Sequence, residues 1–358
     1  MIKNSKELAE ALSPRIYLST ARQAEIDKVR IRFPMRISSY YASLIKEEDD
    51  PIWKQSVPKL EEILIDGNLD PDPLSEEKQS PVPFLVHRYP DRVLLYVSNT
   101  CAVYCRHCTR KRKVGDDRKN PKIEDLKDAF EYIATSKYNQ TPIRSVILSG
   151  GDPLLLNHYM LDEIIGKLKE IPNVESLRIG TRVPVTDPER ITAHLTNLLK
   201  KYDVAWVNTH YNHPREITPE SIEAIRKLRS AGVSIGNQCV LLRGVNDSPE
   251  TMMSLFTGLE KIGVRPYYMY QADLAKGTAH FWTSVDTALE IMQKLIGNVS
   301  GLAVPHYVID SPGGGGKIRV LPDSVRFEDE MAVLRTFQGK EVRYPRDPLN
   351  YYIINNNG

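Results

Sequence analysis

Cysteine is scarce in this sequence: the 358 residues include only four, and three of them, Cys101, Cys105 and Cys108, stand on one short stretch. Four cysteines with three crowded together make a poor disulfide framework, which argues against a secreted, disulfide-stabilised fold. No window approaches the roughly eighteen apolar residues of a membrane-spanning helix. The first residues are polar and helix-forming, unlike a signal peptide. The sequence therefore predicts a cytoplasmic protein that does not engage a membrane.

Neither sign of charge dominates, because 48 lysines and arginines balance 46 aspartates and glutamates to a net charge of +2. A charge this small provides no overall field for holding nucleic acid. The basic run RKRK directly after the third cysteine leaves a nucleic-acid contact open as an alternative. No basic tract with interleaved aromatic residues accompanies it, so we expect no nucleic-acid partner.

The pattern of apolar, polar and proline residues divides the chain into three parts. Residues 1–90 form a helical N-terminal region followed by an extended segment, residues 69–90, that carries five prolines. In residues 91–320 short apolar runs alternate with amphipathic helical patterns, and residues 321–358 form a C-terminal segment. The predicted strands are 92–98, 145–151, 176–182, 204–211, 233–242, 264–271 and 303–310, and the helices between them lie near 158–170, 187–201, 217–231, 249–262 and 283–297.

Such alternation indicates βα units around a parallel sheet. About seven strands in one series favour a full or partial α/β barrel over a doubly wound sheet, because no dinucleotide glycine fingerprint follows the first strand. In such a barrel, chemistry gathers where strands end. The cysteines, GGD (150–152), His210, Asp273 and Asp310 all stand at or just after the ends of predicted strands, and PGGGGK follows the last one.

The spacing C-x3-C-x2-C suits a cubane iron–sulfur cluster whose fourth iron lacks a protein ligand. An iron with an open position is a site for chemistry rather than for simple electron transfer. The alternatives are a structural zinc site, which would need a fourth ligand that His107 is too crowded to supply, or plain buried thiols. Cys239 lies in a predicted strand and is interpreted as a core residue.

These motifs resemble the lysine 2,3-aminomutase family of the radical S-adenosylmethionine enzymes. The cysteines match the superfamily signature, and further stretches match the family in order over roughly residues 80 to 325: SPVPFLVHRYPDRVLLYVSNTCAVYCRHCTRKR, LSGGDPLLL, RIGTRVPV, VNTHYNHPREIT, NQCVLLRGVND, RPYYMYQADL, GTAHFWT and VIDSPGGGGKI. The resemblance implies a partial (β/α)6-type TIM barrel with a helical N-terminal extension. It also implies a 4Fe-4S cluster, S-adenosylmethionine and pyridoxal 5′-phosphate as cofactors.

The resemblance assigns roles residue by residue. Lys317 matches the lysine that holds pyridoxal phosphate covalently; a phosphate-binding glycine loop is the alternative, but a Walker loop would place Ser or Thr after the lysine. The other pyridoxal phosphate contacts are Arg88, Tyr89, Arg92 and Tyr270, although HRYPDR alone would suit surface arginines. The S-adenosylmethionine contacts are Gly150, Gly151, Asp152, His210 and Gln238, although a lone histidine at a strand end is usually a core residue.

Three positions determine the implied substrate. Arg110 matches the arginine that pairs with the substrate α-carboxylate, and Asp273 and Asp310 match the two aspartates that hold its distal ammonium. Singly, each aspartate also suits turn or cap chemistry. Two carboxylates meeting in a closed pocket suit a cation, since otherwise one of them would protonate.

The implied function is the interconversion of L-α-lysine and β-lysine by a radical 1,2-amino shift, an isomerase reaction that takes an electron from a donor such as flavodoxin or ferredoxin. Alternatives are another cationic amino acid, arginine or ornithine, or glutamate. The longer relatives carry further cysteines that bind zinc between subunits, and this sequence has none after Cys239. We therefore expect no such zinc site, and we expect a homo-oligomer.

Overall fold

Seven parallel strands form the centre of the structure. It is a computed structural model that describes residues 1–64, 69–322, 325–329, 331–336 and 338–345. A nine-stranded sheet runs in the order β1-β2-β5-β6-β7-β8-β9-β10-β11. All its neighbours are parallel except the two outermost pairs, β1 with β2 and β10 with β11. The strands are β1 (Leu85–Tyr89), β2 (Arg92–Ser98), β5 (Ser145–Gly150), β6 (Ser176–Gly180), β7 (Trp206–Thr209), β8 (Ser234–Leu241), β9 (Arg265–Gln271), β10 (His306–Ser311) and β11 (Gly316–Arg319).

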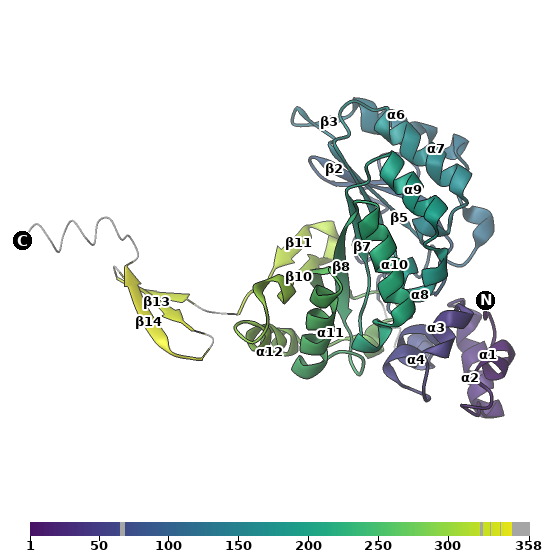
Figure 1. The fold of residues 1–358 in the computed structure, drawn as a ribbon, viewed down its shortest axis with the longest axis horizontal. Coiled ribbons are helices and arrows are strands. Elements are labelled where there is room, and N and C mark those ends of the chain that lie inside the picture. Colours follow the sequence, from purple (N-terminus) through teal and green to yellow (C-terminus); the bar gives the residue numbers. More distant parts are fainter. Residues whose placement is uncertain (65–68, 323–324, 330, 337, 346–358) are drawn as a thin grey trace, which may run out of the picture.

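Helices connect successive parallel strands and cover one face of the curled sheet (Figure 1). They are α6 (Lys127–Thr135), α7 (His158–Lys169), α8 (Val183–Thr186), α9 (Ala193–Lys201), α10 (Pro219–Ser230), α11 (Pro249–Lys261) and α12 (Val285–Leu295). Six strand–helix units followed by a last strand make a partial (β/α)6 barrel, and this prediction is confirmed. Each of the seven predicted barrel strands is present, with ends that differ by at most three residues.

Helix starts in the barrel follow ordinary capping chemistry. Thr218 accepts a hydrogen bond from the backbone N–H of Ser221 at the start of α10, and Pro219 occupies the first turn, where its missing N–H costs nothing. Along β6, buried Leu177 and Ile179 alternate with partly exposed neighbours. They join the core formed with the apolar faces of the helices.

The barrel does not close strand to strand. Its outermost strands, β1 and β11, are not paired with each other in the described sheet. β1 lies within residues 69–90, where the prolines predicted an extended loop rather than a strand. In β1 only Leu85 and Val86 are buried and apolar, which is too short a run to predict a strand. The rest of that segment crosses the open side: the backbone N–H of Gly313 donates to the carbonyl of Pro73 at 2.8 Å.

Short helices make up the N-terminal region, as the sequence indicated: α1 (Ser5–Leu12), α2 (Thr20–Arg30), α3 (Ser39–Ser43), α4 (Pro51–Ser56) and α5 (Glu61–Leu64). They pack against the end of the barrel where the parallel strands finish. Tyr41 of α3, for example, donates to the carboxylate of Glu216, which follows β7. This region therefore reaches the strand ends at which the candidate site lies.

Two small sheets lie outside the barrel. A two-stranded hairpin, β3 (Lys137–Tyr138) and β4 (Thr141–Pro142), precedes β5. Near the C-terminus, β12 (Val325–Glu328), β13 (Met331–Arg335) and β14 (Glu341–Pro345) form an antiparallel sheet that stands apart from the barrel in Figure 1. None of the helices in the described part of the chain is long and apolar enough to span a bilayer.

Candidate active site

The three clustered cysteines lie on the loop that leaves β2, and none of them forms a disulfide. Two backbone hydrogen bonds tie this loop to the N-terminal region: the N–H of Tyr104 donates to the carbonyl of Arg36, and the N–H of Arg106 donates to the carbonyl of Gln55. The loop is thus held from outside the barrel while its sulfurs stay together beside the strand ends.

The number of thiols bears on the kind of metal site that this loop could form. Cys101, Cys105 and Cys108 supply three free thiols. A structural zinc ion would need four ligands around one centre, whereas three cysteines can hold a cubane whose fourth iron has no protein ligand. The donor set therefore fits a cubane with one open iron.

Burial makes these thiols poor acids in the absence of metal. It raises the pKa of Cys101 well above its usual range and, with a contribution from Cys105, raises the pKa of Cys108 to about 11. Since thiolates are the ligands, metal binding must release these protons, so cluster assembly is coupled to deprotonation.

Gly150 and Gly151 bring β5 into close contact with the start of the cysteine loop. Gly150 has φ +115°, and a Cβ on Gly151 would lie 2.5 Å from the carbonyl oxygen of Thr100. Only glycine permits this approach. Asp152 turns inward instead: its carboxylate accepts from the hydroxyl of Thr181 at 2.6 Å and from the backbone N–H of Arg182 at 2.7 Å. Burial raises its pKa to about 6.

His210 directly follows β7 and lies next to Gln238 of the neighbouring strand β8, since Thr209 at the end of β7 is paired with Asn237. Burial is the main cause that lowers the pKa of His210 to about 4, and the Arg182 guanidinium adds to it. His210 is therefore neutral at pH 7 and suited to hydrogen bonding rather than to ion pairing. The structure brings these two residues together as the resemblance implied, and their contact with S-adenosylmethionine stays a prediction.

Lys317 lies on β11 directly opposite Asp310 of β10. Its ammonium donates to the Asp310 carboxylate at 3.2 Å and lies 5.4 Å from the ring centroid of Tyr270. Its backbone N–H donates to the hydroxyl of Tyr89 at 3.0 Å. The guanidinium of Arg88 approaches the same Asp310 oxygen to 3.7 Å. Lys317 thus lies beside two of the other four predicted pyridoxal phosphate residues, Tyr89 and Tyr270, and shares Asp310 with a third, Arg88.

Arg92 stands at the margin of this group. Its guanidinium stacks on the ring of Tyr89 at 4.3 Å and pairs with Asp91 at 3.1 Å. Tyr89 therefore connects Arg92 to Lys317. A cation held over a tyrosine whose hydroxyl reaches the lysine backbone is a reasonable anchor for a phosphate.

Asp273 and Arg110 complete the convergence. Burial, with a contribution from the nearby Asp310 carboxylate, raises the pKa of Asp273 to about 6, although Thr109, Lys317 and Arg110 act in the opposite direction. The hydroxyl of Thr109 donates to Asp273 at 2.6 Å. Residues from four separate segments are therefore within electrostatic reach of one another.

Sequence comparisons identify the family of this chain. A profile of the Radical SAM superfamily matches residues 95–256, and one described as Lysine-2,3-aminomutase matches residues 292–357. The chain is 51% identical to the L-lysine 2,3-aminomutase of Methanococcus maripaludis over 92% of this chain and 76% of that protein. The corresponding enzyme of Clostridium subterminale is 46% identical over 98% of this chain and 84% of that protein. The chain belongs to the lysine 2,3-aminomutase family.

One similar protein has another substrate in its name. A glutamate 2,3-aminomutase of Clostridioides difficile is 44% identical over 95% of this chain and 80% of that protein. A solved radical SAM methyltransferase from Sphaerobacter thermophilus has a TM-score of 0.44 and 17% identity over 64% of this chain and 72% of that chain. The family assignment depends on the sequence relatives alone.

Membership of this aminomutase family brings three cofactors with it: a 4Fe-4S cluster, S-adenosylmethionine and pyridoxal 5′-phosphate. The residues present fit them. Three free thiols share one loop, and the β5 glycines let that strand pack closely against the start of the loop. Beside Lys317, Gly316 has φ +94°, which favours glycine, and a Cβ there would make a tight contact of 3.2 Å with the Tyr89 hydroxyl.

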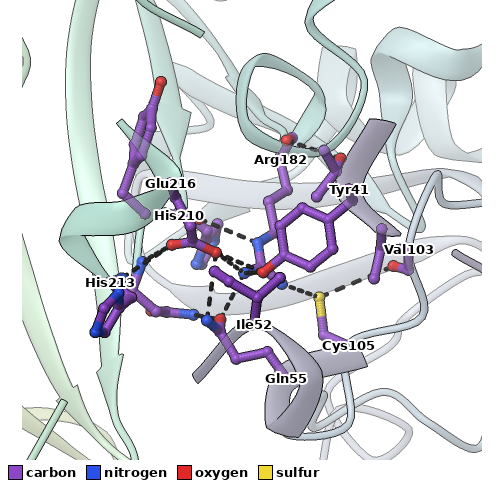
Figure 2. Close-up of polar contacts among 12 residues, drawn as sticks. Tyr41, Ile52, Gln55, Val103, Cys105, Arg182, His210, His213 and Glu216 are labelled. Carbon is purple, nitrogen blue, oxygen red and sulfur yellow. Dashed lines mark hydrogen bonds and ion pairs between the residues drawn. The ribbon is translucent and has the colours of Figure 1, made fainter. Parts of the chain in front are cut away.

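A set of buried residues around Arg182 was not predicted from the sequence, although RIGTRVPV and VNTHYNHPREIT were among the matched stretches. Figure 2 shows the Arg182 guanidinium between Cys105 on one side and Tyr41, Gln55 and Glu216 on the other. Nothing in the sequence connects these positions, because they come from five separate segments of the chain. A buried arginine at a strand end was the available signal.

Two further residues were also missed. Glu76 binds the Arg110 guanidinium through both carboxylate oxygens, each 3.0 Å from Nε. Tyr96 on β2 is buried beside Arg110, and its hydroxyl has no hydrogen-bond partner among the described residues. A buried hydroxyl in this position is available to a bound molecule.

Proposed function

We propose that the protein is a lysine 2,3-aminomutase that interconverts L-α-lysine and β-lysine, an isomerase of free amino acids. When bound, the three cofactors supply the radical chemistry and the electron sink for the amino shift. The chain's own residues hold the substrate at both ends and keep water away from the reacting atoms. In this proposal Arg110 binds the α-carboxylate, and Asp273 and Asp310 bind the distal ammonium.

The position of the Lys317 ammonium is the observation that carries the proposal. The Lys317 side chain is an ammonium on a four-carbon chain, as is the side chain of free lysine. Here the Lys317 ammonium is paired with the Asp310 carboxylate. Asp310 is 9% exposed. Burial and the neighbouring Asp310 carboxylate raise the pKa of Asp273. A nearby cation therefore stabilises the charged form of both carboxylates. Once Lys317 holds the cofactor, its ammonium leaves Asp310 and a substrate ammonium can take that place.

This pair of carboxylates argues against glutamate as the substrate. The distal carboxylate of glutamate would face two buried aspartates, and like charges in a buried site repel strongly. Arginine and ornithine are cationic and differ from lysine in length and shape. Specificity among cations therefore depends on distance rather than on charge.

A substrate panel tests the proposal. Anaerobically reconstituted protein is incubated with lysine, arginine, ornithine or glutamate, and the products are identified by chromatography. We expect β-lysine from lysine, with at least a hundredfold loss in Asp273→Asn, Asp310→Asn and Arg110→Ala, since each leaves a buried charge unpaired. Glutamate turnover at a rate comparable to lysine would contradict the proposal.

Cofactor anchoring is tested by two sets of variants. Alanine at Cys101, Cys105 or Cys108 should abolish iron binding, whereas Cys239→Ala, which lies in the core, should retain the iron. Borohydride should trap pyridoxal phosphate on Lys317, and Lys317→Ala should lose the trapped cofactor while keeping the iron–sulfur absorbance. A cofactor trapped on another lysine would refute the Lys317 assignment.

The partners are part of the proposal. A one-electron donor such as flavodoxin or ferredoxin supplies the cluster, and a reducing compartment such as the cytoplasm suits it. We also propose a homo-oligomer, because the C-terminal sheet carries an exposed apolar face with Val325, Phe327, Val342 and Tyr344. Light scattering of the wild type and of a Phe327→Ser/Tyr344→Ser variant tests this, and an unchanged mass in the variant would exclude that face.

A further inference from the structure

The guanidinium of Arg182 is aimed at one of the cysteine sulfurs. Arg182 directly follows Thr181 at the end of β6, and its side chain is 8% exposed. Its Nη1 donates a hydrogen bond to the Sγ of Cys105 (Figure 2). No role in the proposed function has been given to this arginine.

Nη2 and Nε of Arg182 both have acceptors, which fixes the plane of the guanidinium. The two N–H bonds of Nη2 are shared among three acceptors, the Tyr41 hydroxyl at 3.0 Å, Gln55 Oε1 at 2.6 Å and Glu216 Oε1 at 2.7 Å. Nε donates to the carbonyl of His210 at 3.1 Å. Because the guanidinium is a rigid planar fork, fixing one edge determines where Nη1 points.

The partners of Arg182 are themselves held in place. The second carboxylate oxygen of Glu216 accepts from the backbone N–H of Asn212 at 2.6 Å and from that of His213 at 2.9 Å. Gln55 Oε1 also accepts from the Asn212 side chain at 3.0 Å. Glu216 and Gln55 are both fully buried. The hydrogen bond to Cys105 therefore belongs to a rigid network rather than to one flexible side chain.

We propose that Arg182 is a positioning residue that raises the reduction potential of the cluster by holding a charged hydrogen bond on the sulfur of Cys105. This inference rests on the proposed function, because it presumes that Cys105 binds the cluster. The donor protein gives up one electron and the cluster gains it, so the cluster becomes more negative by one charge. A cation and an N–H directed at a ligand sulfur stabilise that extra charge.

Glu216 does not cancel the effect of Arg182. Its carboxylate lies on the edge of the guanidinium away from the sulfur, so the cation stands between the carboxylate and Cys105. The nearer charge dominates, since Coulomb energy falls with distance. Burial of the whole group keeps water from screening either charge.

The test measures the potential directly. Wild type, Arg182→Gln and Arg182→Lys are reconstituted with iron and sulfide, and the cluster is titrated with a graded reductant without S-adenosylmethionine while its electron paramagnetic resonance is recorded. For Arg182→Gln we expect at least a tenfold shift of the reduction equilibrium towards the oxidised cluster, which is 59 mV or more for one electron. Arg182→Lys, which keeps the charge without the fork, should shift less.

Arg178 offers a matched control. It lies on the same strand β6, is partly buried, and donates to the Ser145 hydroxyl at 3.0 Å, far along the strand from the cysteine loop. Arg178→Gln should leave the potential unchanged. Equal potentials for the wild type and Arg182→Gln would overturn the proposal. A shift in Arg178→Gln as large as that in Arg182→Gln would also overturn it.

Gln55→Leu keeps the proposal testable if Arg182→Gln does not bind iron. The Gln55 side chain accepts a hydrogen bond from Arg182 and, among the described residues, makes none to Cys105. The backbone carbonyl of Gln55, which holds the cysteine loop through Arg106, is kept in the variant, so the change acts on the arginine. We expect a smaller shift in the same direction, and no shift would overturn the proposal. Lysine turnover by the wild type is assayed separately, so the potential and the proposed function can fail independently.

Discussion

Asp273 is the residue of the site whose charge state matters most at mild pH. Burial and the neighbouring Asp310 raise its pKa to about 6, and only the ionised carboxylate attracts an ammonium. The value of kcat/KM for lysine should therefore fall about tenfold per pH unit below pH 6, because it reports the pKa of the free enzyme. An anaerobic pH profile from 5 to 8 measures this, and a flat profile would contradict it.

Thr109→Val isolates the contribution of Asp273 to that profile. The Thr109 hydroxyl donates to Asp273 and lowers its pKa, and valine keeps the shape without the donor. The acid limb should move to higher pH in the variant. A limb that stays in place would show that another group controls it.

Single residues also show where sequence reasoning stops. The cysteines, Lys317 and the two aspartates follow strands or stand in motifs, so their positions could be read from the sequence. Glu76 could not, since it lies in the proline-rich segment and reaches Arg110 only through the folded chain. Pairing between segments 34 residues apart has no periodic signal.

At the scale of elements, the barrel was predictable because each strand and helix carries its own periodicity. The clamp that the N-terminal region makes on the cysteine loop was not. Glu62 of α5 is fully buried and accepts from Arg106 Nε at 2.9 Å and from Lys111 Nζ at 2.7 Å. The basic run after the third cysteine, which left a nucleic-acid contact open, thus has one of its lysines inside the protein.

Glu62→Gln should destabilise the protein by about 3–5 kcal/mol, since it leaves two buried cations without their counterion. The matched variant Glu61→Gln should have almost no effect, because Glu61 pairs with Lys59 at 3.0 Å near the surface. Chemical unfolding at pH 7, followed by circular dichroism, measures both free energies of unfolding. Equal values for the two variants would refute the clamp.

The ion pairs of Glu62 with Arg106 and Lys111 also predict a loss of stability in acid. Burial alone would raise the pKa of Glu62, but Arg106 and Lys111 outweigh it and hold the pKa at about 2, below the 4.5 of an unperturbed glutamate. A lowered pKa contributes stability that is present above pH 4.5 and is lost as the pH falls towards 2. The wild type should lose this increment over that window, and Glu62→Gln should not.

At the scale of the whole molecule, the half-barrel needs a cover for its open side. The proline-rich segment provides it. The side-chain nitrogen of Gln79 donates to the carbonyl of Gly314 at 3.2 Å, and the side-chain oxygen of Gln79 accepts from Arg88 Nε at 2.8 Å. The segment therefore joins the first and last strands of the sheet beside Lys317. Its prolines predicted an extended course but not the surface on which it lies, because an extended chain has no pattern of its own.

Gly314→Ala should open this side of the barrel. Gly314 has φ +89°, and a Cβ there would lie 1.8 Å from the Gln79 side-chain nitrogen and 2.6 Å from the carbonyl oxygen of Leu74. Gly313→Ala is the matched control, because its φ of +75° is strained in the same way while nothing lies within 4 Å of the added carbon. Both variants share the backbone strain, so only the first adds a collision between the two segments.

The rate of tryptic cleavage after Lys78, an exposed residue in the covering segment, reports on the opening. Cleavage should be at least tenfold faster in Gly314→Ala than in Gly313→Ala, because the collision must lift residues 74–79 from the glycine loop. Pyridoxal phosphate should also dissociate faster from Gly314→Ala, since Lys317 lies three residues away. Equal cleavage rates in the two variants would mean that the segment does not depend on this contact to stay closed.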